Sequence, residues 1–305
     1  MNSAADSGEQ VQPRCHTGVA GLIVLSALLF GGCESKSPVE PEPLSDGATS
    51  TEAPLCLELV TARNEVLLGE PLSLLVRLRN CSDNSQTVRD LLNVEYGLLV
   101  VTIGHPEHEE DSYYDPPVRR DGRGKGELQL DPGENISAEV QVYFGHGGWQ
   151  LKTPGTYTFV AEYAADEIPL RSNSLSVEVG IPLSDADRSA ANAMMSDAAA
   201  TFYFMGGGDA TAAAELQAIA DNWPESVWAG YARFGLALDS AGVAAASELK
   251  TQCRVLEDLL VDLRHDWVTA RRGLRALTHC LEDADQQAEI PRVTAEFAAR
   301  HPEAS

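Results

Sequence analysis

The spacing of apolar residues changes once along this chain, close to Pro182. From Leu55 to about Gly180 apolar side chains recur at every second position, which is typical of strands with one buried face. From about residue 183 they recur at intervals of three and four, which is typical of amphipathic helices. The sequence therefore predicts a multidomain chain, with an antiparallel β-sandwich over 55–180 and an all-α domain of helical hairpins over 183–305, and we expect each to fold separately.

Turns that contain glycine or proline divide the first domain into short strands. The expected strands are Leu55–Val60, Leu72–Leu78, Gly97–Ile103, Ile136–Phe144, Thr156–Tyr163 and Ser174–Val179. The segments Gly69-Glu70-Pro71, Asp131-Pro132-Gly133 and Pro154-Gly155-Thr156-Tyr157 resemble those of bacterial immunoglobulin-like domains. That resemblance implies a sandwich in which Tyr157 lies at a corner before a late strand, and it implies no particular function.

The second domain is expected to contain six helices, over 185–204, 210–222, 224–240, 243–263, 267–283 and 286–300. Ser184 and Asp209 are the expected N-caps of the first two, and three consecutive glycines from Gly206 separate these helices. Segments 220–226 and 298–304 align at an offset of 78 residues, and Trp228-Ala229-Gly230-Tyr231-Ala232 resembles the start of a tetratricopeptide helix. The domain is therefore predicted to be repeat-like.

One long apolar run, Gly18–Gly32, precedes Cys33. At about 15 residues it is shorter than the roughly 20 needed to span a bilayer, and it fits the core of a signal peptide over 1–32. The string from Leu28 to Cys33 resembles the lipobox of bacterial lipoproteins, with Phe30 where leucine is usual. The resemblance implies cleavage before Cys33, lipid on that cysteine and a membrane-anchored protein of the bacterial cell envelope; the alternative is a buried helix. Residues 33–54 are rich in Pro, Ser, Glu and Thr and are expected to form a disordered tether.

Four cysteines remain after Cys15 and Cys33 are assigned to the signal peptide and the lipid. If the first two strands pair so that facing residue numbers add to 137, Cys56 faces Cys81. In the helices, seams of apolar residues at intervals of three and four place Cys253 opposite Cys280 in an antiparallel hairpin. We therefore predict these two disulfides; the alternative is four free thiols that pack as small apolar residues.

The charge is strongly acidic, with 46 Asp and Glu against 22 Lys and Arg and a net charge of −24. Such a field repels phosphate backbones, so no nucleic-acid partner is expected.

The candidate metal ligands are His105, His108, Glu109 and Asp111, within the acidic loop 105–115, whose imidazoles and carboxylates suit zinc or calcium. That loop lacks the second histidine of a zincin helix, and a solvated acidic loop is the other interpretation. His146 and Trp149 in a glycine-rich loop are either recognition residues or a turn residue and a packing residue.

The chain contains no Gly-x-Ser-x-Gly, no Cys-x-x-Cys and no EF-hand loop. We therefore expect a non-enzymatic envelope lipoprotein without a cofactor, which acts as a binding or scaffold module for a protein or peptide partner. The alternatives are a metal-dependent enzyme or cation-binding factor that uses loop 105–115, and a structural spacer.

Cys33→Ser is expected to release the protein from membrane fractions, because serine cannot form the thioether to a lipid. The measurement is the distribution of the protein between pellet and supernatant after a carbonate wash, with Cys15→Ser as the matched control. A Cys33→Ser variant that still pellets with membranes would show that the lipid assignment is wrong.

Overall fold

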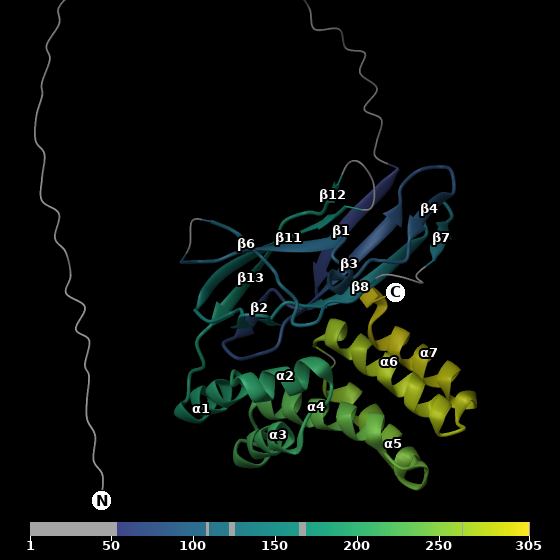
Figure 1. The fold of residues 1–305 in the computed structure, drawn as a ribbon. Helices are drawn as coiled ribbons and strands as arrows, with labels where there is room; N and C mark the ends of the chain where they lie inside the picture. The colour runs from purple at the N-terminus through teal and green to yellow at the C-terminus, as the bar shows by residue number, and fades with distance from the viewer. Residues whose placement is uncertain (1–53, 108–109, 122–125, 165–168, 264, 305) are drawn as a thin grey trace, which may run out of the picture. The chain divides into compact units, whose positions relative to one another are not determined.

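The computed structural model describes residues 54–107, 110–121, 126–164, 169–263 and 265–304 (Figure 1). The predicted signal peptide, Cys33 and nearly all of the predicted tether lie outside the described residues. Within the described ranges, no helix combines the length and the apolar character needed to cross a membrane. Strands fill the described chain as far as Gly180 and helices fill the rest, so the predicted order of a β domain and an α domain is confirmed.

Two sheets pack face to face in the β domain. One has the order β1-β3-β8, formed by Leu55–Thr61, Ser73–Asn80 and Asn135–Gln141. The other has the order β2-β13-β11-β5-β6, with β12 also paired to β11, and is formed by Glu65–Leu67, Leu175–Gly180, Gly155–Tyr163, Leu99–Gly104, Ser112–Tyr113 and Leu170–Arg171. Two small ribbons are formed by β4 (Gln86–Arg89) with β7 (Glu127–Leu130) and β9 (Phe144–Gly145) with β10 (Gly148–Trp149), and η1 (Val94–Tyr96) precedes β5.

All six expected segments contain a strand, although the one expected over Ile136–Phe144 ends at Gln141 and Phe144 belongs to β9. The period of two did not reveal the short strands. The segments β2, β4, β6, β7 and β12 are two to four residues long, too short for an alternation to be recognised. The structure also departs from a purely antiparallel sandwich, because β13 pairs with β2 in parallel.

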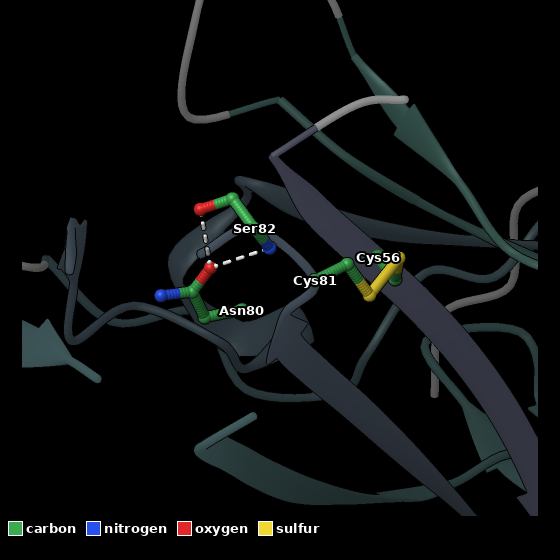
Figure 2. Close-up of a disulfide and its surroundings, with 4 residues drawn as sticks. All are labelled: Cys56, Asn80, Cys81 and Ser82. Atoms are coloured by element: carbon green, nitrogen blue, oxygen red, sulfur yellow. Dashed lines mark hydrogen bonds between the residues drawn. A yellow bond between two sulfur atoms is a disulfide. The ribbon is translucent and has the colours of Figure 1, made fainter. Parts of the chain in front are cut away.

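Cys56 and Cys81 form the first predicted disulfide, with their Cα atoms 5.9 Å apart (Figure 2). The register used to predict it was wrong by two residues. Cys56 pairs with Arg79, so facing numbers add to 135, and the disulfide joins diagonal neighbours. A shift of two residues leaves every side chain on its original face of the sheet, which explains why the pair of cysteines was predicted correctly.

The α domain contains seven α-helices within the described residues. They are α1 (Asp185–Met194), α2 (Asp197–Met205), α3 (Ala210–Asn222), α4 (Val227–Val243), α5 (Ala246–Asp262), α6 (Trp267–Asp283) and α7 (Ile290–Arg300), with short 3-10 turns η2 (Gln287–Glu289) and η3 (Pro302–Ala304). The single helix expected over 185–204 is two helices, because the Ser196 side chain accepts a hydrogen bond from the Ala199 amide and starts a new helix. The expected N-caps Ser184 and Asp209 are confirmed.

The second predicted disulfide, Cys253–Cys280, joins α5 to α6 with a Cα separation of 5.7 Å. Both cysteines are buried in the seam between the two helices. Here the recurrence of apolar residues at intervals of three and four was sufficient to predict the disulfide. It indicates both the buried face and the relative height of two antiparallel helices.

Helix α6 lies on the outer face of the sheet β1-β3-β8. Leu75 has the parity of the face that the alternation predicts to be polar, yet it is fully buried against Trp267 and Val268 of α6. Residues 51–305 accordingly form one compact unit. Whether 55–180 and 183–305 each fold in isolation stays a prediction.

Leu75→Ala is expected to lower the free energy of unfolding by about 3 kcal/mol, because truncation leaves a cavity between β3 and α6. Leu128→Ala, at a partly exposed position on β7, is the control and should have a small effect. Denaturant unfolding measures both. A loss at Leu75 as small as that at Leu128 would contradict the packing of α6 on the sheet.

Candidate binding site

A groove of about 660 Å³ lies at one end of the sandwich. One wall comes from the connection between β5 and β6 and includes His105, Glu107, Glu110 and Asp111. The other comes from the segment that runs from β10 into β11 and includes Gly147, Trp149, Lys152 and Tyr157. We call this the acidic groove. It brings together the two loops that the sequence singled out separately.

The wall around His105 is fixed by contacts with the sandwich. The His105 Nε2 atom is 2.8 Å from the Ser112 hydroxyl, and the ring meets Tyr157 edge-on with centroids 5.5 Å apart. Gly155 has a positive φ of 134°, and a Cβ there would lie 2.7 Å from Cβ of Pro106. Glycine at position 155 therefore allows the loop after β5 to lie against the start of β11.

The opposite wall rests on two buried aromatic residues. The Tyr157 hydroxyl donates to the Thr153 carbonyl at 3.1 Å and accepts from the Thr153 amide at 3.2 Å, which is the corner that the resemblance implied. Trp149 is 3% exposed and donates from Nε1 to the Leu151 carbonyl at 3.1 Å. Trp149 is thus mainly a core residue. His146, the other candidate recognition residue of the glycine-rich loop, is exposed and does not line the groove.

The rim of the groove carries an excess of negative charge. Glu107, Glu110 and Asp111 are exposed, and Lys152 is a basic residue on the opposite wall. Of the predicted metal candidates, His105 and Asp111 line the groove, whereas His108 and Glu109 lie outside the described residues. Within the described ranges, no three His, Cys, Asp or Glu side chains gather as a metal site would require. The chemistry that the described residues offer is attraction of a cationic group to the exposed carboxylates beside His105.

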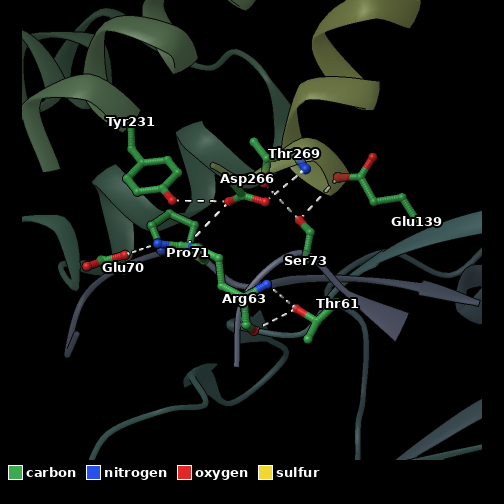
Figure 3. Close-up of polar contacts among 9 residues, drawn as sticks. All are labelled: Thr61, Arg63, Glu70, Pro71, Ser73, Glu139, Tyr231, Asp266 and Thr269. Carbon is green, nitrogen blue, oxygen red and sulfur yellow. Dashed lines mark hydrogen bonds and ion pairs between the residues drawn. The ribbon is translucent and has the colours of Figure 1, made fainter. Parts of the chain in front are cut away.

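A second polar cluster lies where the sandwich meets the helices (Figure 3). Arg63, from the connection between β1 and β2, forms ion pairs with Glu70 and with Asp266, the latter with Nη2 and Oδ2 3.4 Å apart. The same Arg63 nitrogen donates to the Pro71 carbonyl at 3.3 Å. Its guanidinium carbon lies 5.8 Å from the centroid of the Tyr231 ring. Arg63 is only 18% exposed, so these contacts replace most of its hydration.

Asp266 joins this cluster to the start of α6. Its carboxylate accepts from the Thr269 amide at 3.2 Å as the N-cap and from the Tyr231 hydroxyl at 3.1 Å. Burial raises the pKa of Glu70, although the nearby Arg63 opposes that shift. Burial also raises the pKa of Tyr231 well above its ordinary value, so this phenol stays protonated and donates to Asp266. Sequence patterns did not identify Arg63 or Asp266, because these residues are 203 positions apart.

Side chains of α6 continue the polar contacts along β8. Arg271 donates to the Ser137 hydroxyl at 2.9 Å, and Arg272 donates to the Gln141 side-chain oxygen at 2.8 Å. Arg275 lies 2.6 Å from the Glu139 carboxylate, which is 4% exposed. Burial raises the pKa of Glu139, and the charges of Arg275 and Arg272 work against that shift.

Comparison with known proteins adds no family to these observations. No protein-family model matches the chain, and no curated protein matches it. Solved structures that are similar in part include a β-glucosidase from Listeria innocua, at 17% identity over 41% of this chain and 16% of that chain, with a TM-score of 0.25. The CARDB domain of a Pyrococcus furiosus protein gives 12% identity over 42% of this chain and 94% of that domain, with a TM-score of 0.23. The sporulation control protein Spo0M of Bacillus subtilis gives 12% identity over 47% and 55%, with a TM-score of 0.26.

These similarities carry no conclusion about fold or function, because each of the three TM-scores is far below 0.5. The chain also spans only 16% of the length of the Listeria enzyme. Any function proposed for this protein therefore rests on its own sequence and on the geometry of its described residues.

Glu139→Gln is expected to gain stability relative to the natural protein as the pH rises above 4.5, the ordinary pKa of glutamate. A folded-state pKa above the unfolded value means that the carboxyl group stabilises the fold fully below the unfolded pKa and loses that contribution as the pH rises through the folded pKa. Glutamine stays neutral throughout. Denaturant unfolding from pH 4 to pH 8 measures the difference, and Glu127→Gln on β7 controls for net charge. A difference that is flat or falls with pH would contradict the assignment.

Proposed function

We propose that this chain is an exported lipoprotein, held at a membrane by lipid on Cys33, that binds a protein or peptide partner and does not itself catalyse a reaction. The anchor rests on the apolar run before Cys33 and on the Pro- and Ser-rich segment after it. In this proposal the tether holds the folded part away from the membrane. The partner is then met outside the cytoplasm.

The acidic groove is the observation that supports binding most directly. Its walls are loops held by a rigid sandwich, which is the usual setting of recognition residues. Exposed carboxylates from Glu107, Glu110 and Asp111 rim a floor that includes His105 and Tyr157. A segment with lysine or arginine side chains fits this chemistry, since its charges meet the carboxylates while its aliphatic stems lie against the half-buried His105 ring.

The α domain supports a contact function in a second way. Its helices pack mainly against their neighbours along the chain, as α3 does against α4 and α5 against α6, and in our proposal they stack as repeats. Stacked helical pairs of this kind present extended surfaces to other chains. Trp228, Tyr231 and Phe234 are buried, so these aromatic residues build the domain and do not form the contact surface.

Replacement of three groove carboxylates, in the variant Glu107→Gln, Glu110→Gln and Asp111→Asn, is expected to weaken binding of a lysine-rich peptide about tenfold at low salt. The estimate takes several tenths of a kcal/mol for each exposed charge pair. Fluorescence anisotropy with a labelled alternating Ala-Lys peptide measures the affinity, and an Ala-Glu peptide should not bind.

The matched control removes three exposed carboxylates away from the groove, at Glu225, Glu248 and Asp283. Both triple variants change the net charge equally, so only an effect specific to the groove separates them. Equal weakening by both variants would refute the groove as the site. Zinc or calcium binding that is lost in the groove variant would instead favour the cation-dependent alternative.

A further inference from the structure

A separate cavity of about 200 Å³ opens between the start of α4 and the end of α5. Val227, Gly230, Leu259 and Leu263 give it an apolar wall. A Cβ built at Gly230 would meet no heavy atom of the described residues within 4 Å outside its own part of the helix, so the missing side chain leaves open space. Val227 is 40% exposed at this wall, although it is apolar. We call this space the junction cavity.

The charged and titratable residues that line the junction cavity are Asp262, Asp266, Arg63 and His265. Arg63 supplies a cation, but its guanidinium is paired with both Glu70 and Asp266. Asp262, the last residue of α5, adds an exposed carboxylate at the same cavity. Glu70 and Asp266 are both engaged with Arg63, so Asp262 is the carboxylate of the lining that a cation can meet from solvent.

A cavity with apolar walls and a carboxylate beside them suits one kind of side chain. A lysine or arginine side chain has a flexible hydrocarbon stem and a charged end, and such side chains bury the stem while the charge meets a polar group. A short apolar side chain would form no polar contact with the carboxylate, and an acidic side chain would be repelled by it. We propose that the junction cavity receives a single lysine or arginine side chain of the bound partner, with the stem against Val227 and Leu263 and the cation at Asp262.

This inference rests on the proposed function, since it supplies a second contact for the same basic partner. It differs in location, because the acidic groove is built by the loops of the sandwich and the junction cavity by α4, α5 and Arg63. The two sites can therefore be tested independently.

The probe is Nα-acetyl-lysine methylamide, with Nα-acetyl-norleucine methylamide as the comparison because it has a hydrocarbon stem and no charge. Binding to the purified protein is followed by NMR chemical-shift changes during titration. The lysine compound is expected to bind at least fivefold more tightly than the norleucine compound and to shift the amides around Gly230 and Asp262. The corresponding arginine compound should show the same preference over norleucine.

Two variants test the cavity itself. Gly230→Leu fills the open space and is expected to abolish binding, while leucine favours the helix more than glycine and so should not unfold it. Its control is Gly242→Leu, in the same helix, where a Cβ also meets open space and which does not line the cavity. Asp262→Asn is expected to weaken binding at least threefold. Its control is Asp283→Asn, which removes an exposed charge from the last residue of α6.

Unchanged binding in Gly230→Leu, or equal affinity for the norleucine compound, would overturn the junction cavity as a cation site. The triple groove variant should bind the lysine compound as the natural protein does. If the groove variant loses this binding and Gly230→Leu keeps it, the inference fails while the proposed function stands. If the groove variant binds the lysine-rich peptide as the natural protein does, but Gly230→Leu abolishes binding of the lysine compound, the acidic groove fails as a site while the junction cavity stands.

Discussion

The ion pairs of Arg63 are the interaction on which the rest of this structure depends. A guanidinium that is mostly withdrawn from water is tolerated only where carboxylates and hydrogen-bond acceptors replace its hydration. Glu70 and Pro71 come from the nearby connection between β2 and β3, but Asp266 comes from the start of a helix 203 residues later. Because Asp266 also caps α6 through the Thr269 amide, the residue that pairs with Arg63 is the residue at which α6 begins.

The position of α6 then determines what the two halves expose. With Leu75 covered by Trp267 and Val268, part of the outer face of β1-β3-β8 is an interface instead of a solvated surface. The two places at which we propose recognition are the acidic groove of the sandwich and the junction cavity beside α4 and α5. Exposed carboxylates lie at both places, in agreement with a net charge of −24.

The features that local patterns control were predicted well. Helix α6 has the predicted bounds, because Asp266 caps it and its apolar residues recur without interruption, and the same seam predicted Cys253–Cys280. What could not be predicted depends on long-range packing. Alternation assumes solvent on one face of a strand, so it could not reveal that Leu75 is buried, and Arg63 looks like any charged loop residue until Asp266 is placed beside it. The acidic groove had the same difficulty, since each of its loops alone resembles an ordinary polar turn.

Native-state hydrogen exchange tests most directly whether this interface makes one unit of the two halves. We predict that the slowest backbone amides of β3 and of α6 exchange with the same free energy of opening, and that Arg63→Met lowers both by the same amount. Amides of α6 that open at a clearly lower free energy than those of β3, with only one of the two sets responding to Arg63→Met, would contradict a single cooperative unit.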